Sequence, residues 1–263
     1  MIQDWRAQWA AVGSSPTQPF VFVQLSAWPT QDSPIIPVFR VAVENALALP
    51  NVGMVVSCDV NDPAGAVHPI HPMWKKEVAR RAALWADNVV YGNSSSPTAG
   101  PRVVSATWDN WQADWGAYHY QTGSGSYVCQ TGTAGPWFCG GVRIQFDAPV
   151  AVRPYFAPLP PTATGFYGMI SGADSGLQLW SDGNVTSPGT GTTWFQPTTL
   201  TSISADGLTV QLNVTWIAPL VAPPKVLRYA WHDYPGSMPL VGAVSGLPVS
   251  PFVAEVVPAA LPA

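Results

Sequence analysis

PFVFVQL at residues 19–25 and VGMVVS at residues 52–57 are the stretches that decide the fold of the first part of this chain. Both are short runs of apolar residues, which is typical of strands buried on both faces of a parallel sheet. A helix is predicted between them, and one face of it carries Val38, Val41, Ala42, Asn45 and Leu49. Strand, helix and strand in this order predict a crossover unit, so this part belongs to the α/β class.

Two further helices are predicted in this part, a short amphipathic one at residues 2–12 and a long one that opens at Pro72. Proline favours the first turn of a helix because its missing N–H would have no partner there. One face of the long helix is apolar and carries Trp74, Val78, Ala82, Trp85 and Val89. The only basic group of the sequence is expected to be a solvated helix face, and it consists of Lys75, Lys76, Arg80 and Arg81.

Beyond the polar run at residues 93–100, apolar residues recur at every second position. Val142, Ile144 and Phe146 alternate with polar residues, and residues 208–216 show the same alternation. We therefore predict two domains. Residues 1–92 are expected to be part of an α/β domain, and residues 93–263 an antiparallel β-sandwich-like module.

Composition excludes several classes of partner. Charged residues make up 10% of the chain and the net charge is −4, which gives no electrostatic basis for binding nucleic acid or an anionic membrane. No apolar run approaches the ~20 residues of a membrane-spanning helix. The start MIQDW predicts no signal peptide, whereas the sequons at Asn93, Asn184 and Asn213 are compatible with a secreted origin.

The cysteines leave one question open. Cys129 and Cys139 lie close together in a predicted hairpin or long loop, which permits a disulfide in an oxidising compartment. Cys58 ends an apolar run and is interpreted as a buried thiol.

The loop of residues 58–71, CDVNDPAGAVHPIH, is the candidate site of the first part. Asp59, Asp62, His68 and His71 follow a predicted strand, and α/β proteins bind ligands at the carboxyl ends of their strands. By itself this pattern favours a structural role, because Asp and His often cap a following helix. Pro69 between His68 and His71, and the absence of further His or Cys nearby, argue against zinc. No phosphate-binding glycine loop follows a strand, so no metal or cofactor is expected.

Residues 105–141 are rich in aromatic side chains: Trp108, Trp111, Trp115, Tyr118, Tyr120, Tyr127 and Trp137. Such rings can stack on a sugar, or they can fill a β core. Core packing is the favoured interpretation.

Six blocks of the sequence resemble, in order, the sialate O-acetylesterase family, whose catalytic domain is of the SGNH hydrolase type. They are MIQDWRAQW at 1–9, PFVFVQL at 19–25, LPNVGMVVSCD at 49–59, IHPMWKKEVARRAALWA at 70–86, VYG at 90–92 and VLRYAWHDYP at 226–235. The resemblance implies that residues 1–92 are the C-terminal part of an SGNH-like three-layer domain. It also suggests a secreted or lysosomal-type location and an O-acetylated sugar as substrate.

In that family the histidine of the I-H-P-x-x-K segment is catalytic, and this role transfers to His71. An imidazole can take the proton of a serine hydroxyl as the serine attacks an acyl carbon. Many SGNH enzymes place an aspartate shortly before the histidine, where this chain has His68 and Pro69. Asp62 is the candidate that orients the ring. Asp59 in that role, a dyad and an inactive site remain as alternatives.

The nucleophile is expected on a segment outside these residues, because family members carry it well before the DWR block. No G-x-S-x-G elbow occurs here, and Ser57 and Ser171 are interpreted as ordinary polar residues. The resemblance therefore implies the histidine-bearing part of an ester hydrolase that is inactive alone. Its serine-bearing half is expected either as a separate chain or as an upstream region. The alternative is a noncatalytic remnant or carbohydrate-interacting β module. For a partial sheet, we expect exposed apolar surface on residues 19–25 or 52–57.

Overall fold

The computed structural model describes residues 1–27, 35–60, 71–72, 74–121, 127–152, 177–180, 196–197, 199–216, 226–231, 238 and 240–258. Side chains are described in these ranges except at 109–141, 177–180, 196–201, 213–216 and 258. The chain divides into two compact units. The first is built mainly from Met1–Gly100 and includes Ser245–Ser250, and the second is built mainly from Pro101–Trp231 and Pro251–Ala263. The domain boundary predicted after residue 92 stays a prediction.

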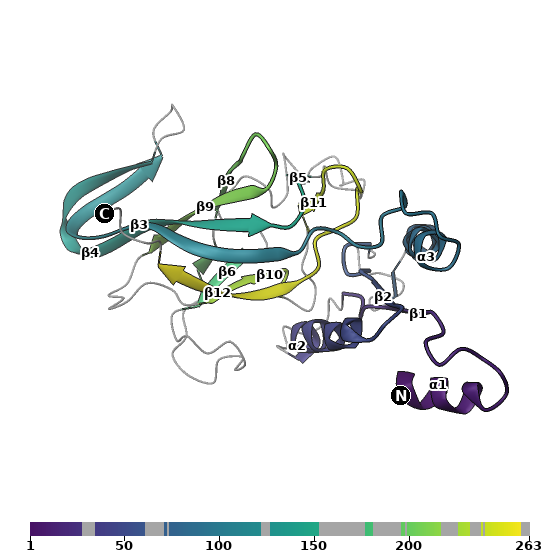
Figure 1. The fold of residues 1–263 in the computed structure, drawn as a ribbon. Coiled ribbons are helices and arrows are strands. Elements are labelled where there is room, and N and C mark those ends of the chain that lie inside the picture. Colours follow the sequence, from purple (N-terminus) through teal and green to yellow (C-terminus); the bar gives the residue numbers. More distant parts are fainter. Residues whose placement is uncertain are drawn as a thin grey trace. The chain divides into compact units, whose positions relative to one another are not determined.

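The first unit combines helices with a parallel pair of strands (Figure 1). Its elements are α1 (Ile2–Ala10), β1 (Phe20–Val23), α2 (Ile35–Ala42), the 3₁₀ helix η1 (Val43–Ala48), β2 (Val52–Val55) and α3 (Lys75–Val89). β1 and β2 run parallel, with Phe20 opposite Val52 and Val23 opposite Val55. The α/β class and the order of strand, helix and strand are thus confirmed, whereas α3 begins at Lys75, after the predicted start at Pro72.

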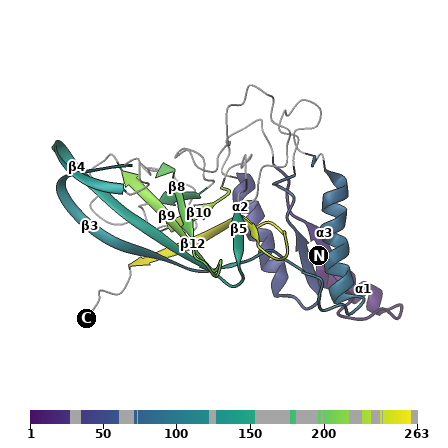
Figure 2. The same cartoon turned by 90° about the horizontal axis from the view of Figure 1, so that it is seen from above.

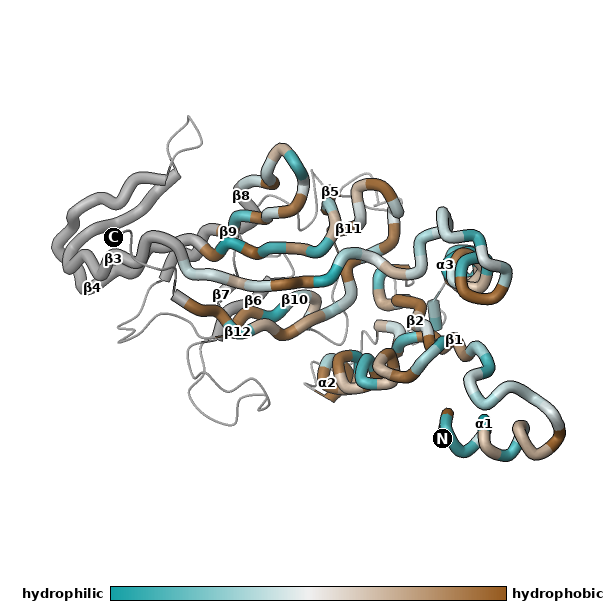
Figure 3. The backbone as a smooth tube through the Cα atoms, in the orientation of Figure 1, coloured by the Kyte–Doolittle hydropathy of each residue, from teal (hydrophilic) through white to brown (hydrophobic). Residues whose placement is uncertain are grey.

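α3 packs on β2 through a close approach at Gly53. A Cβ at this position would lie 2.1 Å from Nε1 of Trp85, whose side chain is 4% exposed. A strand glycine is expected where another element approaches this closely. α3 carries both hydrophobic and hydrophilic residues (Figure 3), as a helix with one buried face requires.

β1 and β2 share one face that α3 covers only at β2, and on this face β1 exposes apolar side chains. Val21 and Val23 lie opposite Gly53 and Val55 in the register, so the four residues share one face of the strand pair. Val55 is 2% exposed, but Val21 and Val23 are 37% and 51% exposed. The apolar exposure expected at residues 19–25 is therefore confirmed.

Arg6 fastens α1 to the starts of both strands. Its side chain is 5% exposed, and its guanidinium donates hydrogen bonds to the carbonyl oxygens of Gln18 (2.6 Å) and Pro50 (2.8 Å). These carbonyls precede β1 and β2, so one buried side chain joins three segments.

The second unit is built from strands. These are β3 (Val103–Gln121), β4 (Tyr127–Phe146), β5 (Val150–Val152), β6 (Leu177–Trp180), β7 (Gln196–Pro197), β8 (Thr199–Ile203), β9 (Thr209–Trp216), β10 (Val226–Tyr229), β11 (Leu240–Gly242) and β12 (Phe252–Pro258). The described strands form an eight-stranded sheet in the order β7-β6-β10-β12-β3-β4-β9-β8 and a small β11-β5 pair. β3 and β4 are long, curved neighbours (Figures 1 and 2).

This sheet differs from the antiparallel module predicted for residues 93–263. β12 pairs with β3 in parallel, so the sheet is mixed, and the sandwich is not confirmed. The final strand inserts between β10 and β3 and runs in the direction of β3. Local alternation predicts strands but carries no information about such long-range pairing.

The predicted strand faces are confirmed where side chains are described. Val142, Ile144 and Phe146 are at most 2% exposed, whereas Arg143 between them is exposed. All four residues of β10 are buried. The ring of Tyr229 stacks on Phe252 at a centroid distance of 5.3 Å, which adds an aromatic contact to the core.

The register of β3 and β4 answers the question of the disulfide. Cys129 lies opposite His119 and Cys139 opposite Gln112. His119 and Gln112 are seven residues apart, which is about 23 Å along β3 at the ~3.3 Å rise of a strand. A disulfide requires Cα atoms within about 7 Å, so this register is incompatible with a bond between Cys129 and Cys139.

Candidate active site

His71 lies in the connection that leaves the carboxyl end of β2 and enters α3. β2 ends at Val55, and α3 begins at Lys75. Of the residues that continue from β2, Val56, Ser57, Cys58 and Val60 are buried and Asp59 is half-buried. His71 is exposed. Among the positions singled out from the sequence, Asp62, His68 and Ser171 lie outside the described residues. The roles of His71 and Asp62 therefore stay predictions.

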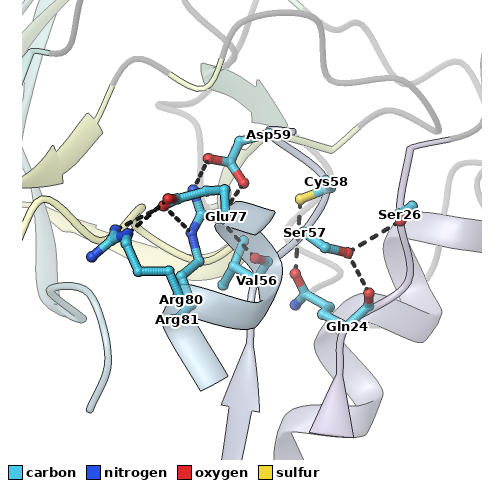
Figure 4. A network of polar contacts seen from close by, with 9 residues as sticks. All are labelled: Gln24, Ser26, Val56, Ser57, Cys58, Asp59, Glu77, Arg80 and Arg81. Carbon is cyan, nitrogen blue, oxygen red and sulfur yellow. Dashed lines mark hydrogen bonds and ion pairs between the residues drawn. The ribbon is translucent and has the colours of Figure 1, made fainter. Parts of the chain in front are cut away.

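Asp59 forms a buried ion pair with Arg81 of α3 (Figure 4). Arg81 Nη1 donates to Asp59 Oδ1 at 2.6 Å, and Nη2 donates to Oδ2 at 2.8 Å. The side chains are 0% and 3% exposed. This parallel, two-bond geometry is the strong form of an arginine–carboxylate contact, and it joins the start of the connection to the helix that follows it.

The environment of Arg81 corrects the prediction of a solvated basic face. Lys75, Lys76 and Arg80 are exposed as expected, but Arg81 is buried. Arg81 lies three residues after Val78 and four before Trp85, on the apolar stripe of the helix, and this spacing could have identified it. A buried guanidinium needs partners on several sides, and besides Asp59 it has the carbonyl oxygen of Val56 at 2.8 Å.

Glu77 completes this charged cluster on the surface side. It accepts hydrogen bonds from Arg80 Nε at 2.7 Å and from Arg81 Nε at 2.9 Å. The hydrogen bond from Arg80 is the main cause that lowers the pKa of Glu77 to about 2. Burial by itself lowers the pKa of Arg81, but the contacts with Asp59 and Glu77 outweigh it and the pKa is raised. Both residues are therefore charged across the neutral pH range.

The carboxyl ends of β1 and β2 are joined by a second polar network, which Figure 4 also shows. Ser57 is fully buried and its hydroxyl donates to the carbonyl oxygen of Gln24 at 2.7 Å. The hydroxyl of Ser26 lies 3.2 Å from that of Ser57. These contacts support the interpretation of Ser57 as an ordinary polar residue, because its hydroxyl serves the backbone.

Cys58 is buried, as predicted. Its side chain is 0% exposed and its Sγ lies 3.8 Å from Oε1 of Gln24. Burial is the main cause that raises the pKa of Cys58 to about 11. The thiolate is the reactive form of cysteine, so this environment opposes a nucleophilic role.

Arg40 of α2 binds backbone carbonyl groups just beyond the end of β1, as Arg81 of α3 binds one just beyond the end of β2. It is 0% exposed and donates to the carbonyl oxygens of Leu25 (2.9 Å) and Ser26 (2.7 Å), just beyond β1. Gln24 donates through Nε2 to the carbonyl oxygen of Arg40 at 3.2 Å and to Ser250 Oγ at 3.2 Å. Sequence reasoning missed Arg40, although a single charge in the apolar segment IIPVFRVA is a signal for it.

Within the described part of the chain, no group of three or more His, Cys, Asp or Glu side chains is arranged to hold a metal ion. No described helix is long and apolar enough to cross a membrane. In the residues that follow β2, this edge of the first unit carries the exposed side chain of His71 and the buried side chains of Ser57 and Cys58.

No protein-family model matches this sequence, and no curated protein matches it significantly. Its fold is similar to that of a solved carbohydrate acetylesterase. That protein is XAC1771 from Xanthomonas citri, with 25% sequence identity and a TM-score of 0.61. The similarity covers 97% of this chain and 44% of XAC1771, so the chain spans less than half the length of that protein.

This similarity supports an esterase-like relationship and a mixed α/β fold. It does not distinguish the sialate O-acetylesterase family from other carbohydrate esterases.

Proposed function

We propose that this chain provides the histidine-bearing part of a carbohydrate esterase that removes O-acetyl groups from sugars such as sialic acid. The observation that carries the proposal is the similarity to a carbohydrate acetylesterase along 97% of the chain. His71 is the general base. The serine nucleophile comes from a serine-bearing segment, either joined to this chain or supplied as a separate half.

The position of His71 supports this role. It is exposed, and it follows the carboxyl end of a parallel strand, where α/β proteins place their reactive groups. In the reaction its imidazole takes the proton from the serine hydroxyl as the oxygen attacks the acetyl carbon. The imidazolium then gives that proton to the sugar oxygen that leaves. Asp62 is the candidate that orients the ring.

The test is hydrolysis of 4-nitrophenyl acetate and of an O-acetylated sialic acid. The purified chain is compared with a protein extended by the coding sequence upstream of Met1, and His71→Ala is made in both. General-base catalysis contributes about 10²- to 10⁴-fold, so His71→Ala should lower kcat of the extended protein by at least ~10²-fold. His68→Ala is the matched control, because it removes the same side chain three residues earlier.

Activity of the extended protein that depends on His71 supports the proposal. If His68→Ala abolishes the hydrolytic activity and His71→Ala does not, His68 is the general base. Activity in the short chain contradicts the expectation that its nucleophile lies elsewhere. Inactivity of both proteins, with binding of the sugar retained, favours the noncatalytic carbohydrate-interacting module.

A further inference from the structure

The connection that carries His71 is closed at its base by contacts between its two ends. Asp59 at the start pairs with Arg81 of α3 at 2.6 and 2.8 Å. The backbone N–H of Trp74, just before α3, donates to the carbonyl oxygen of Val60 at 3.5 Å. His71 precedes Trp74 by three residues, so the contact at Trp74 restrains the chain close in sequence to His71.

The ion pair is the stronger of these two contacts. Both side chains are almost fully buried, which weakens competition from water and salt. The guanidinium of Arg81 also reaches the carbonyl oxygen of Val56 at 2.8 Å and Glu77 Oε1 at 2.9 Å. One planar group thus fixes the end of β2, the start of the connection and the first turns of α3. A lysine ammonium cannot reproduce these directions, because it lacks the fork of parallel N–H donors.

We infer that Asp59 and Arg81 are positioning residues, which hold the connection so that the His71 imidazole meets the reacting serine. The inference rests on the proposed function. Neither residue has to touch substrate, because the effect passes through the backbone of the connection. A catalytic group must be held within about 0.5 Å of its productive position, and displacement by ~1 Å can cost about 10²-fold in rate.

The experiment combines hydrogen exchange with kinetics in the extended protein. The variants are Arg81→Met, Arg81→Lys and Asp59→Asn, and the matched control is Arg80→Met. Arg80 is the neighbouring arginine on α3, and it donates two hydrogen bonds to Glu77 at 2.7 and 2.8 Å. Arg80→Met therefore removes the same charge without touching the base of the connection.

The exchange measurement has an internal reference. The N–H of Gln24 donates to the carbonyl oxygen of Val55 at 2.8 Å and reports on the β1–β2 pair. Arg81→Met and Asp59→Asn should speed exchange at Trp74 by about 10-fold or more, with Gln24 unchanged. In the kinetics, Arg81→Met should lower kcat by ~10²-fold with KM within about 2-fold of the parent. The kcat of Arg81→Lys should lie between those of Arg81→Met and the parent, because lysine retains the charge but lacks the fork of parallel N–H donors.

Equal acceleration at Trp74 and Gln24, with activity falling in proportion to the folded fraction, would make the pair a stability element and overturn the inference. Unchanged exchange at Trp74 in Asp59→Asn and Arg81→Lys would overturn it as well. If His71→Ala leaves hydrolysis intact, the proposed function fails and the pair has no role in positioning a catalyst. A selective change at Trp74 would then still establish the closed base of the connection, because exchange does not depend on activity.

Discussion

Replacing Gly53 with alanine tests the packing of α3 on β2, which supports the connection that carries His71. The new Cβ would lie 2.1, 2.3 and 2.5 Å from three atoms of the Trp85 indole, where ordinary contacts begin near 3.4 Å. The ring or the helix must therefore move by about 1 Å. Overpacking a buried site costs about 1–3 kcal/mol, and because the indole is rigid and 4% exposed we expect about 3 kcal/mol.

The assay is urea unfolding followed by circular dichroism at the helical minimum. Gly92→Ala is the control, because Gly92 has a φ of +79° and open space around its Cβ position. Alanine there should cost about 1 kcal/mol through the backbone alone. A double-mutant cycle with Trp85→Leu isolates the contact, since the smaller side chain leaves room for the new methyl group.

In the Trp85→Leu background, Gly53→Ala should cost less than about 1 kcal/mol, whereas the cost of Gly92→Ala should be unchanged. A Gly53→Ala variant that loses the same free energy of unfolding in both backgrounds would refute the close approach of Trp85 to β2. A loss below about 0.5 kcal/mol in the parent would refute it too.

Three further predictions concern single side chains. Because the pKa of Glu77 is lowered from 4.5 to about 2, its carboxylate contributes stability above pH 4.5 that is lost as the pH falls towards 2. Glu77→Gln should therefore lower the free energy of unfolding by about 1 kcal/mol at pH 6 and have no effect near pH 2. A difference in this free energy that does not change with pH would contradict the prediction. Burial raises the pKa of Cys58 to about 11, so this thiol should resist iodoacetamide at pH 8 in the native protein and react in urea, as judged by peptide mapping. Rapid labelling of the native protein would show that the carboxyl end of β2 opens to solvent. Arg6→Met removes the buried donor to the carbonyl oxygens of Gln18 and Pro50 and should cost about 2 kcal/mol in urea unfolding, with partial recovery in Arg6→Lys. No loss would mean that α1 is held by other contacts.

Much of the first unit could be predicted from the sequence, because its signals are local. The apolar runs at 19–25 and 52–57 predict β1 and β2, and the 3.6-residue period predicts α3 and its buried Trp85. The alternation at 142–146 likewise predicts which side of β4 is buried. Each of these patterns depends on residues within a few positions of one another, so no knowledge of the fold is needed.

The tertiary structure decided what depends on distant residues. β12 inserts beside β3 in parallel, and the β3–β4 register separates Cys129 from Cys139. The helical period places Arg81 on the apolar side of α3, but only the fold brings it Asp59, which lies 22 residues earlier in the chain. A charge becomes buried only where the fold brings it a complementary group, so the sequence determined which elements form and which faces they bury, and only their packing decided which partner each buried charge meets.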